Sequence, residues 1–232
     1  MMSRTSAGLL CAVWFCMSAS AEQLVNTSTS GAPASILLAE RASIKADLWA
    51  MHETDQRNRL LLNKTTDEVE RKKLWDVQIA IDKLNQTRLE EIVKTHGWPG
   101  IKDFGQKAAQ AAFLIVQHSN SKMMKQYYPM LRTAMELGDA DKASFALLDD
   151  RIRMNDGKPQ LYGSQLQRDD KTGKLVYWMI EDEANVDQRR AAMGLGTLAE
   201  NATRFKNVEY VPYSERIACE QLRKVEQIEE NK

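Results

Sequence analysis

The residues best suited to acid–base chemistry lie beside tight turns and at the predicted ends of helices. The candidates for catalysis are His96, His118, Asp150 and Tyr162. Histidine gains and loses a proton near neutral pH, and a carboxylate or a phenol can orient it or share its proton. These residue types would support hydrolysis or elimination, with His118 as the acid–base group and Asp150 or Tyr162 as its partner.

A second set of side chains can bind a ligand without reacting with it. The candidates for ligand binding are Gln117, Arg151, Gln160 and Gln165. Gln160, Tyr162 and Ser164 alternate along a predicted strand, so they would share one face. That face could form the wall of a pocket for a small molecule or a peptide. The alternative is a polar edge strand that packs on helices.

Each of these residues also has a purely structural interpretation. His96 precedes Gly97 at the end of a predicted helix and could bond the last carbonyl groups. His118 could be a core histidine whose hydrogen bonds are all made inside the fold. Asp150 and Arg151 are neighbours in sequence and do not face each other on a helix, so each could form an ion pair across the fold.

Other reaction chemistries have weaker support. The chain has three histidines, His52, His96 and His118, and none are at zinc-protease spacing. We predict no metal and no cofactor, and a three-histidine site assembled through space is the alternative. Ser164 lacks the small-residue elbow of a hydrolase nucleophile, and no glycine loop that could cradle phosphate is present.

The composition and the first residues restrict which classes of binding partner and which cell compartment we expect. Basic and acidic residues balance at 32 each without forming a charged patch, so nucleic acid is not an expected partner. Arg4, an apolar run over 7–17 and a small-residue cleavage site over 19–21 predict a signal peptide at residues 1–21. We therefore expect a periplasmic or secreted protein. No segment predicts a membrane span, and cleavage would leave only Cys219, which excludes an intramolecular disulfide.

Helical periodicity dominates the remaining chain. After a flexible leader over residues 22–35, residues 36–232 predict a single, mainly α domain with one small β-hairpin. Two long helices are expected over 36–63 and from a capping signal at 65–68 to residue 96. A third over 104–118 is apolar nearly all round, which predicts a buried central helix. Its glutamines share one face and should meet polar partners: Gln106, Gln110 and Gln117. Helices over 122–137 and 141–154, a hairpin within 161–180 and shorter helices complete the prediction, the last after Pro212.

Several short motifs together resemble a known family. They are His96-Gly97-Trp98-Pro99, Gln117-His118, Asp150-Arg151, the run from Gly157 to Gln165, and Val186-Asp187-Gln188-Arg189-Arg190 through Gly194-Leu195. In this order they resemble a bacterial family catalogued as domain of unknown function 6624, over roughly residues 55–199. The resemblance implies one intact domain and singles out these residues, but it implies no reaction. The chain departs from the family at Asn120, where Asp is usual, and at Ser164, where Thr is usual.

The sequence favours one function and leaves a second open. We predict an exported protein that binds a small ligand or peptide in a polar pocket, because no nucleophile or metal motif is present. The alternative is an acid–base hydrolase or lyase that acts on an envelope or extracellular substrate through His118.

Overall fold

The structure is a computed structural model that describes residues 34–169 and 173–205. The predicted signal peptide, most of the predicted leader, the helix expected after Pro212 and Cys219 all lie outside the described residues. The first helix begins at Ala34, so the last two residues of the predicted leader belong to it.

The fold is mainly α, as predicted. The long helices are α1 (Ala34–Lys64), α2 (Glu68–His96), α4 (Gln106–Gln117), α5 (Ser121–Glu136) and α6 (Lys142–Asn155), and a single turn, α3 (Ile101–Phe104), precedes α4. Near the end of the described chain lie the 3-10 turn η1 (Glu183–Asn185), α7 (Val186–Ala192) and α8 (Leu198–Ala202). Within these described ranges, no helix is both long enough and apolar enough to cross a membrane.

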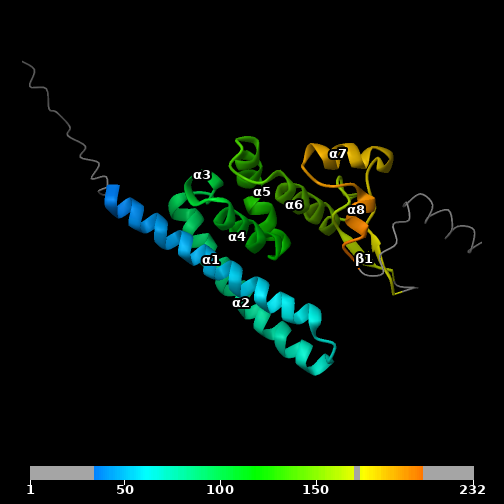
Figure 1. Cartoon of the computed structure of the whole chain (residues 1–232), viewed down its shortest axis with the longest axis horizontal. Helices are drawn as coiled ribbons and strands as arrows, with labels where there is room; N and C mark the ends of the chain where they lie inside the picture. Colours follow the sequence, from blue (N-terminus) through cyan, green and yellow to red (C-terminus); the bar gives the residue numbers. More distant parts are fainter. Residues whose placement is uncertain (1–33, 170–172, 206–232) are drawn as a thin grey trace, which may run out of the picture.

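Helices α1 and α2 form a long hairpin whose connecting loop extends beyond the other helices (Figure 1). The first helix has 31 residues, a length of about 46 Å. The second begins where the Asp67 carboxylate accepts the N–H of Glu70 at 2.8 Å, which confirms the capping signal. It ends at His96, and the following Gly97, with a positive φ of 76°, caps it by donating its N–H to the carbonyl of Val93.

Helix α4 lies at the centre of the main core, as its apolar composition predicts. It packs against α1, α2, α3, α5 and α6. Ala108, Ala111 and Ala112 are fully buried, and their small side chains let the neighbouring helices approach closely. The prediction for the glutamine face is wrong for two residues, because Gln106 and Gln110 are exposed. Both line a small surface pocket beside Leu131 and Ser144, and of the three glutamines only Gln117 is buried.

The β-hairpin is shorter than the sequence predicts. Strands β1 (Leu166–Arg168) and β2 (Leu175–Tyr177) pair antiparallel, with Leu166 opposite Tyr177. Residues 161–165 turn instead of extending, because Gly163 has φ 62°. A Cβ atom at Gly163 would lie 2.5 Å from the Leu198 side chain, so this close packing requires glycine. The predicted strand face of Gln160, Tyr162 and Ser164 does not form.

A second, smaller hydrophobic cluster lies under the hairpin. Its buried members are Tyr177, Ile180, Val186, Leu198 and Ala202. The hairpin, α7 and α8 gather together at one end of the molecule (Figure 1). Helix α6 and the turn after it connect this cluster to the main core.

Candidate functional site

Four of the predicted site residues line one pocket between α4, α6 and the chain that leads into β1. The pocket has a volume of about 400 Å³. Its polar lining is Gln117, His118, Arg151, Ser164 and Gln165. Its apolar lining is Phe113, Leu114, Leu147, Met154, Leu166 and Phe205. A volume of this size and a mixed lining are typical of small-molecule sites.

Helix geometry explains how these side chains meet. His118 ends α4, and its N–H still bonds the carbonyl of Leu114 at 3.0 Å. On α6, Leu147, Arg151 and Met154 are spaced by four and three residues, so they share the face that lines the pocket. Asp149 and Asp150 fall on other faces of the same helix and are absent from the pocket lining.

The partner of His118 is Asp55 on α1, and not Asp150 or Tyr162. The His118 Nδ1 atom lies 3.3 Å from the Asp55 Oδ2 atom. The His118 side chain is 21% exposed, and Nδ1 is its buried nitrogen, so the exposed part of the ring lies away from Asp55. This contact is an ion pair when the His118 ring is protonated, and the Nδ1 atom makes no hydrogen bond within the described residues.

Asp55 is buried and is held as a carboxylate by several donors. Its Oδ1 accepts the Arg59 Nε–H at 2.7 Å and the Gln78 amide at 2.9 Å, and its Oδ2 accepts the Gln56 amide at 2.7 Å. Burial acts to raise the pKa of Asp55, but His118 and Arg59 outweigh burial and lower this pKa to about 2. Asp55 is therefore a fixed negative charge that orients the His118 ring.

Three polar atoms at the pocket are buried without a hydrogen bond within the described residues: Gln117 Oε1, Arg151 Nε and His118 Nδ1. Of these, His118 Nδ1 has the ion-pair contact with Asp55. The ion pair predicted for Arg151 is also missing there. Burial and the nearby Arg59 guanidinium lower the pKa of Arg151. The Gln117 and Arg151 groups can therefore bond a ligand without first breaking a contact inside the protein.

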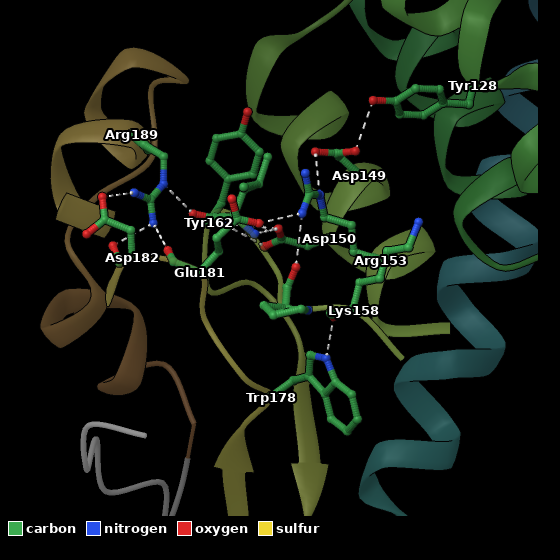
Figure 2. Close-up of polar contacts among 12 residues, drawn as sticks. Tyr128, Asp149, Asp150, Arg153, Lys158, Tyr162, Trp178, Glu181, Asp182 and Arg189 are labelled. Carbon is green, nitrogen blue, oxygen red and sulfur yellow. Dashed lines mark hydrogen bonds and ion pairs between the residues drawn. The ribbon is translucent and has the colours of Figure 1, made fainter. Parts of the chain in front are cut away.

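Asp150 belongs to a structural network on another side of α6 (Figure 2). Its side chain is fully buried and accepts the backbone N–H groups of Leu161 at 2.7 Å, Tyr162 at 3.0 Å and Ser164 at 2.9 Å. Burial raises the pKa of Asp150, and these donors work against that rise. The sequence predicts an ion pair for Asp150. In the structure, this carboxylate instead accepts hydrogen bonds from the backbone of a turn.

Gln160 and Gln165 brace the same turn. The fully buried Gln160 amide donates to the carbonyls of Gln165 at 3.1 Å and Trp178 at 2.9 Å, and accepts the N–H of Gln165 at 2.8 Å. Gln165 donates to the carbonyl of Leu147 at 3.3 Å and reaches the pocket lining, whereas Gln160 does not. The position of Gln160 thus ties the turn to the hairpin.

Tyr162 lies among charged side chains that include Asp150 and Arg189 (Figure 2). Burial, together with Asp149 and Asp150, raises the pKa of Tyr162, so its phenol stays protonated at neutral pH. Asp149 accepts the Tyr128 hydroxyl at 2.9 Å, and Arg153 bonds Glu181 at 2.9 Å. Within the described chain, no hydrogen bond or ion pair joins Tyr162 or Asp150 to His118.

Two arginines of α7 clamp the backbone of the turn. Arg189 donates to the carbonyl of Leu161 at 2.8 Å and also to those of Glu181 and Asp182. Arg190 donates to the carbonyl of Tyr162 at 2.6 Å and to that of Gly196 at 2.5 Å. Burial lowers the pKa of Arg190. The turn is therefore fixed by Asp150, by Gln160 and by the two arginines before any ligand binds.

The motifs that build the pocket and the turn also identify the family. The model of a family of unknown function, DUF6624, matches residues 42–211. The chain belongs to DUF6624. The match includes Asp55 and every predicted site residue. Searches of curated proteins and of solved structures found no match.

The remaining histidines of this DUF6624 chain lie elsewhere. The His96 Nε2 atom lies 3.3 Å from Glu40, and the two residues line a separate pocket of about 210 Å³. Glu40 and Asp55 lie about 22 Å apart along α1, so their partners His96 and His118 belong to two separate pockets. In the described part of the chain, no group of three or more His, Cys, Asp or Glu side chains could hold a metal ion.

A larger pocket of about 490 Å³ lies between α1 and α2 near their loop, and none of the predicted site residues line it. Its charged lining residues are Arg59, Glu68, Arg71 and Lys72. Among its described residues, no buried side-chain atom lacks a partner, in contrast to the pocket beside His118. We therefore place the candidate site of this DUF6624 protein at His118.

One departure from the DUF6624 pattern has a local explanation. The Asn120 side chain caps α5 by accepting the N–H of Met123 at 3.0 Å. Aspartate caps helices about as well as asparagine, so either residue fulfils this role. Asn120 is exposed and does not line the pocket.

Proposed function

We propose that this protein binds a small molecule, or the end of a peptide, in the pocket beside His118. The main support is the pair of buried polar atoms, on Gln117 and Arg151, that have no partner in the described chain. Folded proteins pair nearly all buried polar groups, because an unpaired one costs about 1–3 kcal/mol. A ligand with complementary groups would remove that cost and gain apolar contacts with Phe113 and Leu147.

The chain would act outside the cytoplasm. Arg4, the apolar run over residues 7–17 and Ala19-Ser20-Ala21 support export and cleavage. We expect the mature protein to begin at Glu22 and to be recovered from the periplasm or the medium, as measured by mass spectrometry of the fractions. An intact Met1, or recovery from the cytoplasm alone, would contradict this proposal.

Replacing His118 by alanine is expected to weaken ligand binding at least about tenfold while changing stability little. Asp55 keeps the donors of Arg59, Gln78 and Gln56, so the loss should stay below about 1 kcal/mol, or about 4 °C in Tm. The measurement is a thermal-shift screen of a fragment library containing neutral, anionic and cationic compounds, followed by titration of the hits.

His96→Ala is the matched control, since it removes the same side chain from the other histidine pocket. This variant should bind the hits as the wild type does. If no hit depends on His118, or if His118→Ala lowers Tm as much as a core substitution, the residue is part of a closed network and the binding proposal fails.

A second candidate function is acid–base catalysis, and the His118–Asp55 pair is the observation that favours it. Asp55 would be a positioning residue that holds Nδ1, and His118 would move a proton at Nε2. The same variants can be given chromogenic esters and glycosides. Turnover that falls by about 10²–10⁴-fold in His118→Ala, and not in His96→Ala, would support catalysis over binding alone.

A further inference from the structure

Arg151 has no counter-ion among the residues that the structure describes. Its Nε atom is buried and unbonded there, and the described charged group that perturbs it is another cation, Arg59. Arg153, two residues further along α6, bonds Glu181 and the carbonyl of Pro159. Arg189 and Arg190 likewise bond backbone carbonyls. Arg151 differs from all three.

The rest of the pocket does not neutralise this charge. None of the described residues that line it is acidic. Asp55, the carboxylate that contacts His118, is already bonded by Arg59 at 2.7 Å. Within the described chain, the pocket therefore has one uncompensated positive charge in partly buried surroundings, where an opposite charge is attracted more strongly than in bulk water.

We propose that Arg151 binds the carboxylate of a small monoanionic ligand whose apolar body packs against Phe113, Leu147 and Met154. This inference rests on the proposed binding function and specifies its ligand class. A planar guanidinium matches the two oxygens of a carboxylate. A single unpaired cation suits a single negative charge better than a doubly charged phosphate. The Gln117 amide lies in the same lining and can bond a polar group next to the carboxylate.

The test uses three probes with one skeleton and different charges: 4-phenylbutyrate, 4-phenylbutanamide and 4-phenylbutylamine. Each is titrated by calorimetry into the full-length wild type, Arg151→Met and Arg153→Met. The acid should bind the wild type at least about tenfold more tightly than the amide or the amine. Arg151→Met should abolish this preference, because methionine keeps the apolar stem without the charge. Arg153→Met should keep the preference.

Thermal denaturation gives an independent readout. Arg151→Met should raise Tm in the absence of ligand, since it removes a buried charge that has no partner. Arg153→Met should lower Tm, since it leaves Glu181 and the Pro159 carbonyl without their donor. A fall in Tm for both variants would show that Arg151 has a structural partner and would overturn the inference.

The binding outcomes separate this inference from the proposed function. Equal affinity for the acid, the amide and the amine would overturn the monoanion inference and leave ligand binding intact. So would undiminished acid binding by Arg151→Met, or no binding of any probe when the fragment library yields neutral compounds that depend on His118. If neither the probes nor the library bind, both proposals fail.

Discussion

Replacing Asp150 by alanine is expected to lower the free energy of unfolding by about 3–4 kcal/mol. The substitution leaves the buried N–H groups of Leu161, Tyr162 and Ser164 without their acceptor. Each unpaired buried donor costs about 1–3 kcal/mol, and partial rearrangement of the turn reduces the sum. Urea denaturation followed by circular dichroism would measure the change.

Asp156→Ala is the control for this experiment, because Asp156 is an exposed acid directly after the same helix. Its ion pair with Lys125, at 2.5 Å, should contribute less than about 1 kcal/mol. A normal unfolding curve for Asp150→Ala, together with lost binding or turnover, would show that Asp150 acts on a ligand and does not chiefly hold the turn.

The second large effect is expected for Ala112→Asp. Ala112 is fully buried at the centre of α4, in contact with the apolar core of the long helices. A carboxylate there would have no cationic partner and no room, so the cost should reach about 5 kcal/mol or more, comparable with the whole stability of many domains. We expect the cooperative thermal transition to disappear from the circular dichroism signal.

Gln110→Asp introduces the same acid two residues earlier on α4, at an exposed position. Its effect should stay within about 1 kcal/mol, since only helix propensity and surface charge change. Similar unfolding curves for Ala112→Asp and the wild type would mean that α4 is not the central helix of the fold.

The sequence predicted the helices well because their signals are local. The Asp67 cap, the glycine after His96 and the apolar composition of α4 each act within one or two turns of helix. A polar end on a buried helix needs polar surroundings, so the sequence also predicted that six polar residues would converge. Gln117, His118 and Arg151 do line one pocket, whereas the other three do not: Asp150, Gln160 and Tyr162.

Asp55 was missed as a site residue, although the sequence contains a signal for it. Leu48, Met51 and Asp55 follow one another at spacings of three and four, so Asp55 continues the buried stripe of α1. A carboxylate on such a stripe requires partners. Which residues supply them depends on how α1, α2 and α4 pack, and that packing is not visible in any one segment.

The turn after α6 shows a second reason why the sequence could not predict the structure. Its alternating polar residues predict a strand when only neighbours are considered. The hydrogen bonds that decide its shape come from Asp150, eleven residues before Leu161, and from Arg189 and Arg190, much later in the chain. Contacts between distant segments override the local pattern.

The bracing of this turn has a thermodynamic consequence for any ligand of the pocket. Fixing one residue of backbone costs about 1–2 kcal/mol of conformational entropy. Asp150, Gln160 and the two arginines already fix residues 160–165 in the folded protein. The entropy cost is therefore part of the free energy of folding and does not weaken ligand binding. A ligand meets a preorganised wall at Ser164 and Gln165, so little of its interaction energy is lost to ordering the protein. Even a ligand with few contacts could therefore bind with useful affinity.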